Sequence, residues 1–149
     1  ISDSRIINNN RQTTNYHGIK MTNSKYCKVT GCTIGANRGY GIYLNDASKI
    51  TINSNQFPSE NQIGAIGGSI DSSCIIEDNI GFVTENSGTA FSITSGTWVP
   101  HGLAGTPTIV ILTPRSQVTV WCMARNSTHI RIGVSSGTVT VDWYAEYKP

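Results

Sequence analysis

The feature that most constrains the fold is the stretch 18–57, which passes twice through one pattern of glycine, apolar and small residues. Each position of the first pass recurs 23 residues later in the second. The first pass consists of Gly18, Ile19, Met21, Ser24, Cys27, Val29, Cys32 and Ile34, and the second of Gly41, Ile42, Leu44, Ala47, Ile50, Ile52, Asn55 and Phe57. A fixed period of this length is typical of one structural unit stacked on itself.

Within each pass the apolar residues lie two apart and are interrupted by Asn, Gly and Ser, which is the pattern of short strands rather than of helices. Three short strands per repeat, each with one face directed inward, predict the coils of a parallel β-helix. A core of the form apolar-x-x-Asn/Cys extends the repeat to residues 7–10 and 76–79, at steps of 22, 23 and 24. We expect Asn10, Asn55 and Asn79 to form a hydrogen-bonded ladder, or to take left-handed conformations at a corner, with Cys32 interrupting the column.

The fourth coil, about 65–82, differs from those before it. Gly68 replaces the Leu44 of the preceding coil, and two positions that should face outward become isoleucine, Ile75 and Ile80. Exposed isoleucines suggest a covering partner, either the following domain or a neighbouring copy of the chain. Because the chain begins inside repeat-like sequence, we also expect further coils upstream.

The period ends after Phe82, and the polar segment 84–89 is the expected linker. The predicted domains are a β-helix at 1–85 and a small antiparallel β-sandwich at 86–149. Strands are expected at 89–93, 108–112, 118–124, 129–134 and 138–147, separated by glycine and proline turns. The fold class is therefore all-β.

The second half also carries a resemblance. The segment 97–114, TWVPHGLAGTPTIVILTP, together with the closing VDWYAE at 141–146, resembles a module at the C-terminus of β-helix proteins. Such modules are similar to the C-terminal heads of phage and archaeal-virus tailspikes and related adhesins. The resemblance implies a right-handed β-helix, a homotrimer, and a structural turn at His101, and it implies no catalytic residue.

Bulk composition excludes several functions. Charged residues make up 13% of the chain, the formal net charge is +2, and no block of like charge occurs, which argues against nucleic acid as a partner. No apolar run is long enough to span a membrane. The cysteines, at positions 27, 32, 74 and 122, lack metal-ligand spacing and are expected to be reduced. Cys27 and Cys32 fall on inward positions of the repeat and should be buried.

No catalytic residue, metal site or cofactor is predicted. The carboxylates do not form a facing pair of the kind that a glycosidase needs. Arg38 with Asp46 and Asp71 comes nearest to the calcium-dependent arrangement of a pectate lyase. We expect this segment not to be an enzyme, although the full-length chain could be a polysaccharide depolymerase.

Aromatic residues give the better functional indication. Tyr16, Tyr40 and Tyr43, with Arg38, form a candidate carbohydrate-binding set, because ring faces stack on the apolar faces of sugars. The alternative is that these rings shield strand edges or pack between subunits. The expected subunit-interface residues are Ile75, Ile80, Trp98, Trp121, Trp143 and Tyr144, where the tryptophans could equally be core anchors.

Together these observations predict a viral tailspike or fibre fragment that forms homotrimers and contacts cell-surface polysaccharide. Its expected location is the virion tail or the cell surface. Two alternatives remain open at the level of sequence: the non-catalytic part of a pectate-lyase-like polysaccharide lyase or glycoside hydrolase, and a prokaryotic surface adhesin.

Overall fold

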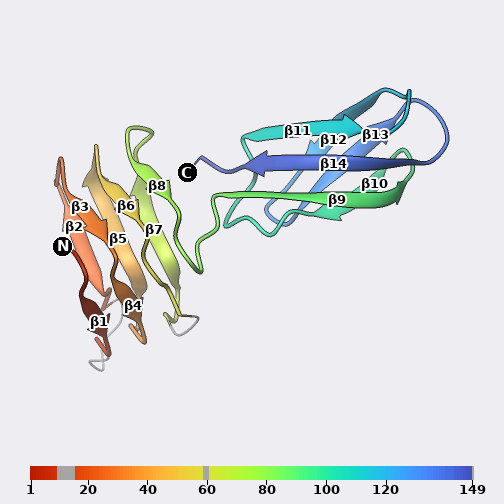
Figure 1. Cartoon of the computed structure of the whole chain (residues 1–149). Helices are drawn as coiled ribbons and strands as arrows, with labels where there is room; N and C mark the ends of the chain where they lie inside the picture. Colours follow the sequence, from red (N-terminus) through yellow and green to blue (C-terminus); the bar gives the residue numbers. More distant parts are fainter. Residues whose placement is uncertain (10–15, 59–60, 149) are drawn as a thin grey trace. The chain divides into compact units, whose positions relative to one another are not determined.

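A computed structural model describes residues 1–9, 16–58 and 61–148. The described residues form β-strands and no helix, and the chain divides into two compact units, 1–83 and 84–148 (Figure 1). It follows that no helix able to cross a membrane is present in these ranges.

The first unit is built from parallel strands that stack coil upon coil. Its strands form the sheets β2-β5-β7, β3-β6-β8 and β1-β4. They are β1 (Arg5–Ile7), β2 (Ile19–Thr22), β3 (Lys28–Thr30), β4 (Thr33–Gly35), β5 (Tyr40–Ala47), β6 (Thr51–Asn53), β7 (Gly64–Ile70) and β8 (Ile75–Glu77).

The repeat read from the sequence is the register of these sheets. Ile19 pairs with Ile42, and Val29 pairs with Ile52, each 23 residues apart. Ile52 then pairs with Ile76 at a step of 24. The parallel β-helix is confirmed for these coils, although each sheet contains only two or three short strands.

The register expected for the first coil is wrong. A step of 22 would place Ile7 beside Val29, whereas Ile7 pairs with Gly35 and Ser2 bridges to Thr30, a step of 28. The connection from β1 to β2 is longer than the equivalent connection from β4 to β5 and takes up the difference. A repeat motif found by local pattern alone misaligns a coil that carries an insertion.

The interior of the first unit is filled by the inward residues of the repeat. Val29, Ile34, Ile42 and Ile52 have no exposed surface, and Cys32 is also buried. Cys27, expected to be buried, is exposed. Cys27 lies just before β3, and its thiol donates to the carbonyl oxygen of Lys25 at 3.5 Å.

Glycine opens each repeat because the corner it occupies has no room for a side chain. A Cβ placed on Gly18 would lie 2.6 Å from the carbonyl oxygen of Gly41, and one on Gly41 would lie 2.7 Å from that of Ala65. These distances are shorter than van der Waals contact. The corner residues of successive coils therefore stack backbone on backbone.

Buried asparagines hold neighbouring coils together. The Asn55 side-chain amide donates to Oδ1 of Asn79 at 3.0 Å, and the amide N–H of Cys32 donates to Oδ1 of Asn55 at 3.0 Å, so the column continues through the cysteine's backbone. The predicted ladder is confirmed for Asn55 and Asn79, while Asn10 lies outside the described residues. The left-handed conformation falls one residue earlier, at Ser54 and Asp78.

A second asparagine column was not predicted. Asn37 donates from Nδ2 to Oδ1 of Asn61 at 2.9 Å, and Asn9 donates its backbone N–H to Oδ1 of Asn37 at 3.3 Å. Asn61 also donates to the carbonyl of Ile34 at 2.9 Å. Both columns satisfy polar groups that the corners would otherwise bury without partners.

The second unit consists of antiparallel strands in two sheets, ordered β10-β13-β12 and β11-β14-β9 (Figure 1). Its strands are β9 (Glu85–Ile93), β10 (Thr97–Pro100), β11 (Ile109–Pro114), β12 (Val120–Arg125), β13 (His129–Val134) and β14 (Val139–Glu146). Both sheets contribute to one cluster of buried residues, which includes Ile130 and Ile132 from one and Val141 and Ala145 from the other.

Two expectations for this half need correction. The polar segment 84–89 is not a linker, because β9 begins at Glu85 and pairs there with Glu146. Strand β10 was not among the expected strands. Polar residues form a strand here because one face of β9 is exposed, so the alternation is weak in sequence but the backbone still pairs with β14.

His101 has the structural role that the resemblance implied. Its side chain is 1% exposed, Nδ1 accepts the backbone N–H of Leu103 at 3.0 Å, and Nε2 lies 3.0 Å from the carbonyl oxygen of Asn126. Because Nδ1 accepts, the proton is on Nε2, which donates to that carbonyl.

Candidate functional site

The outer face of the sheet β2-β5-β7 carries a stack of three rings, His17, Tyr40 and Tyr43. Tyr40 and Tyr43 are three residues apart, so strict alternation along β5 would place them on opposite faces. They share a face because Gly41 and Ile42 are both buried at the corner where the strand begins. The two tyrosine ring centroids are 5.9 Å apart.

His17 completes the stack from the preceding coil. Its ring lies nearly parallel to that of Tyr43, with centroids 4.3 Å apart and planes 7° apart. The backbone N–H of Tyr40 donates to Nδ1 of His17 at 3.0 Å. Burial, and then the charge of Lys20, lower the pKa of His17, in agreement with a neutral ring that accepts at Nδ1.

Tyr40 lies across the next coil. A Cβ on Gly67 would be 2.3 Å from Cε1 of Tyr40, so glycine at this position makes room for the ring. One face of Tyr40 is thus covered by backbone, and one face of Tyr43 is covered by His17. Both tyrosines are partly buried, and these contacts join neighbouring coils.

The remaining members of the predicted carbohydrate set lie beside this stack. Tyr16 is exposed just before β2. Arg38 is half-buried in the turn before β5, where its backbone N–H donates to the carbonyl of Asn9 at 3.3 Å. Sequence reasoning did not include His17, although its offset of 23 from Tyr40 was a signal that could have found it.

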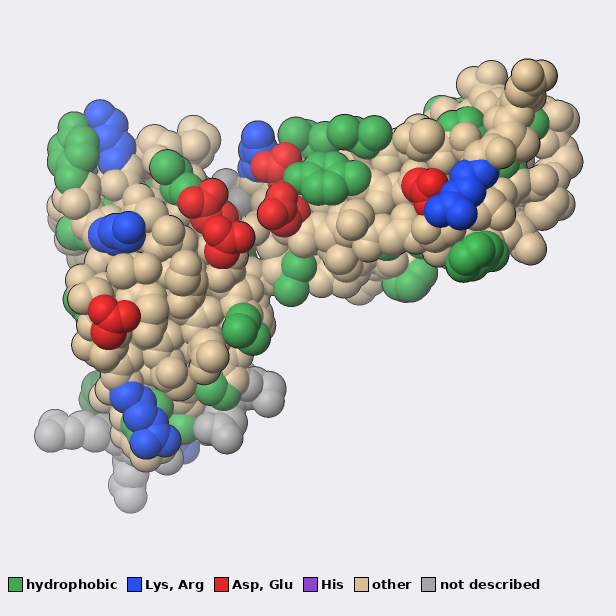
Figure 2. Space-filling model, in the orientation of Figure 1, with side chains coloured by type: hydrophobic (Ala, Val, Ile, Leu, Met, Phe, Trp, Pro, Cys, Tyr) green, Lys and Arg blue, Asp and Glu red, His purple; other side chains and the backbone are tan. Residues whose placement is uncertain are grey.

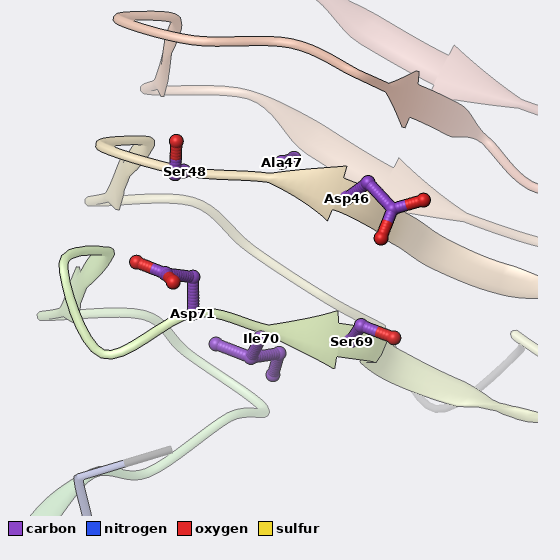
Figure 3. A pocket seen from close by; sticks show the side chains of 6 residues that line it. All are labelled: Asp46, Ala47, Ser48, Ser69, Ile70 and Asp71. Atoms are coloured by element: carbon purple, nitrogen blue, oxygen red, sulfur yellow. The ribbon is translucent and has the colours of Figure 1, made fainter.

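The carboxylates Asp46 and Asp71 line a cavity of about 400 Å³ at the ends of β5 and β7 (Figure 3). Figure 3 shows their side chains at opposite ends of it, Asp46 from β5 and Asp71 from the turn after β7. Asp71 accepts from the backbone N–H of Ser73 at 2.9 Å and from its hydroxyl. These bonds lower the pKa of Asp71, so it is an ionised acceptor and not a proton donor. The other lining residues are Ala47, Ser48, Ser69 and Ile70.

Arg38, which was grouped with Asp46 and Asp71 from the sequence, is not among the residues that line this cavity. Among the residues described, no three His, Cys, Asp or Glu side chains are close enough together to hold a metal ion. A glycosidase also needs two carboxyl groups facing one another across a sugar. Asp46 and Asp71 do not have that arrangement in Figure 3.

Comparison with known families settles the class of the first unit. Residues 1–101 match the family described as the right handed beta helix region. The chain belongs to this β-helix family. The match covers all the parallel coils and continues into β10 of the second unit. No curated protein matches the chain.

The predicted interface residues of this β-helix protein fall into two groups. Ile75 and Ile80, in the last coil, are 51% and 66% exposed. Ile75 continues a column of Lys28 and Thr51, and Ile80 a column of Thr33 and Gln56. Both outward columns thus change from polar to apolar in the same coil.

The aromatic members lie in the second unit. Trp143 is 8% exposed and belongs to the core of its own chain, which leaves Trp98 and Trp121, both about half exposed, as surface residues. Tyr144 is partly buried, and its hydroxyl donates to Oε2 of Glu85 at 2.9 Å, which raises the pKa of Tyr144. Of the three tryptophans, therefore, one is a core anchor.

Proposed function

We propose that this β-helix protein is a non-catalytic segment of a viral tailspike or fibre that assembles as a homotrimer and attaches to polysaccharide at a cell surface. The observation that carries the proposal is the change in the outward columns of the last coil. Two isoleucines stand there at 51% and 66% exposure, where the preceding coils carry lysine, threonine and glutamine. Burying such a pair against a second copy would stabilise the assembly by removing apolar surface from water.

The second unit supports the same proposal as the candidate trimerisation head. Two antiparallel sheets contribute to one core, which is the arrangement of a β-sandwich. A unit of this size has a small core, and association of three copies would add buried surface to it. Three copies would also raise avidity for a repetitive surface glycan.

The chemistry of the carboxylates favours attachment over catalysis in this segment. Asp71 is held ionised by Ser73, and Asp46 lies at the other end of the cavity. An acid and a base flanking a glycosidic bond would need different environments that drive their pKa values apart. Asp46 and Asp71 do not face one another in this way in Figure 3, and for that reason attachment is proposed in preference to cleavage.

The test is the oligomeric state of the whole chain, measured by sedimentation equilibrium at micromolar concentration. The expected result is a trimer that dissociates to monomers when Ile75→Ser and Ile80→Ser are combined. Ile63→Ser is the matched control, since Ile63 is 49% exposed in the same unit but lies outside both columns. A parent chain that remains monomeric would contradict the proposal, as would a double variant that remains trimeric.

A further inference from the structure

The outer face of the sheet β10-β13-β12 displays two large aromatic side chains. Trp98 is 45% exposed and Trp121 is 44% exposed. Trp98 pairs with Arg131 and Trp121 pairs with Gly133, and directly opposed residues of an antiparallel pair share a face. Since Arg131 and Gly133 are two residues apart on β13, all four lie on one side of the sheet. We refer to Trp98, Trp121, Arg131 and Gly133 as the tryptophan face.

The two rings are held in defined positions. Trp121 lies against Gly133, where an added Cβ would be 2.2 Å from Cε2 of the indole. Trp98 has the guanidinium carbon of Arg131 5.8 Å from its ring centre and the edge of His129 beside it, with centroids 6.5 Å apart at 89°. From the strand spacing and rise, the Cα atoms of the two tryptophans are about 12 Å apart, a span that a short oligosaccharide covers.

The three strands of this sheet carry charge of one sign. β10, β12 and β13 contain no aspartate or glutamate, and they contain Arg125 and Arg131. Arg131 donates from Nε to the carbonyl of Gly96 at 3.2 Å, and among the described residues its two terminal nitrogens have no hydrogen-bond partner. The guanidinium can therefore accept an anionic ligand without breaking an ion pair.

The other sheet of the same unit differs. The face over β14 and β9 in Figure 2 shows side chains of both charges. Arg115 is paired there with Asp142 at 2.8 Å, and Lys148 lies 3.4 Å from Glu146. Uncompensated positive charge is thus a property of the tryptophan face and not of the unit as a whole.

We propose that the tryptophan face binds an acidic polysaccharide, one whose sugars carry carboxylates. Indole faces stack on the C–H surfaces of sugar rings, and a planar guanidinium pairs with a carboxylate through two parallel hydrogen bonds. The indoles of Trp98 and Trp121 flank the guanidinium of Arg131. This order matches the alternation of apolar sugar faces and carboxylates along an acidic polysaccharide. The inference deepens the proposed attachment function and rests on it, and it assigns Trp98 and Trp121 to the ligand instead of to a subunit interface.

The test uses the full chain and a galacturonic acid oligomer, with a glucose oligomer of equal length as the neutral control, by isothermal titration calorimetry. The acidic oligomer is expected to bind, and to weaken with added salt because the carboxylate contact is exposed. Trp98→Ala, Trp121→Ala and Arg131→Gln should each weaken binding about tenfold, the loss of one stacked ring or ion pair. Phe91→Ala is the matched control, because Phe91 is 71% exposed on the other sheet and should leave affinity unchanged.

Gly133→Ala tests whether binding depends on the position of the Trp121 ring and not only on its presence. It retains both tryptophans but displaces the Trp121 ring from β13, so it should lower affinity while circular dichroism shows a folded chain. This variant and Arg131→Gln keep the test valid if a tryptophan variant fails to fold.

Several results would overturn the inference: no binding of the acidic oligomer, equal binding of the neutral one, or tighter binding of an oligothymidylate probe. Tryptophan variants that lose trimers instead of affinity would likewise assign the face to a subunit interface. Light scattering on the same samples keeps the two proposals distinct. A trimer that does not bind the acidic oligomer would contradict the ligand proposal but agree with the proposed homotrimer. A monomer that binds the oligomer would contradict the homotrimer but agree with the ligand proposal.

Discussion

Asn55→Ala should open the coils around it, because Asn55 links three of them from a position with no exposed surface. Its Nδ2 donates to Oδ1 of Asn79 at 3.0 Å and to the carbonyl of Val29 at 3.1 Å, and its Oδ1 accepts the N–H of Cys32 at 3.0 Å. A typical hydrogen bond contributes about 1 kcal/mol net, so losing three costs about 3 kcal/mol, or roughly a hundredfold in the opening equilibrium.

The matched control is Asn53→Thr, two residues away in the same coil. Oδ1 of Asn53 is buried and has no hydrogen-bond partner among the described residues. Threonine already occupies the equivalent position in the preceding coil, at Thr30, which pairs with Asn53. Removing an unsatisfied buried oxygen should leave stability within about 0.5 kcal/mol of the parent or raise it slightly.

Hydrogen–deuterium exchange read by mass spectrometry is the appropriate assay. The three tryptophans, at positions 98, 121 and 143, all lie in the second unit, so tryptophan fluorescence would not report opening of the first unit. Peptides from 28–57 should exchange about a hundredfold faster in Asn55→Ala, and peptides from 120–134 should serve as the unchanged internal reference. Equal protection of 28–57 in the parent and Asn55→Ala, or a larger loss in Asn53→Thr, would contradict the role of Asn55 in joining the coils.

Three further predictions follow from individual contacts. Gly41→Ala should destabilise the first unit by about 2–3 kcal/mol in denaturant titration, because its Cβ would lie 2.7 Å from the carbonyl of Ala65; an unchanged midpoint would contradict the stacked corner. A maleimide should label Cys27 in the native chain and label Cys32 only after unfolding, and the reverse order would refute the coil register. Hydrogen bonds from Arg115 lower the pKa of Asp142 in the folded chain. The ionised Asp142 therefore stabilises the fold above the ordinary carboxyl pKa, and this stabilisation is lost as the pH falls through the lowered, folded-state pKa. Asp142→Asn should therefore be less stable than the parent at neutral pH and converge with it in acid, and a constant difference across that range would be evidence against the pair.

The coils could be predicted because inward residues must be apolar at every repeat, which leaves a strong signal in sequence. Val29 and Ile52 carry that signal, and the register follows from it. The first coil could not be aligned, because Ile7 resembles Val29 locally while its true partner, Gly35, has no side chain to mark the position.

The candidate site was less predictable than the fold. Tyr40 and Tyr43 could be singled out as outward aromatics, but the burial of Gly41 and Ile42, which brings the rings together, depends on the tertiary corner. Trp98 and Trp121 could not be told from Trp143 by sequence. Only their registers with Arg131 and Gly133 place the first two on an exposed face.

The fold depends above all on the stacking of coils in parallel register, and methyl–methyl nuclear Overhauser effects measure that stacking directly. Selective labelling of isoleucine and valine methyls in the whole chain should give cross-peaks between Val29 and Ile52 and between Ile52 and Ile76. Val29 and Ile76, two coils apart, should give none, since their strands are about 10 Å apart. A direct Val29–Ile76 contact without either neighbouring contact would contradict the β-helix and every proposal built on it.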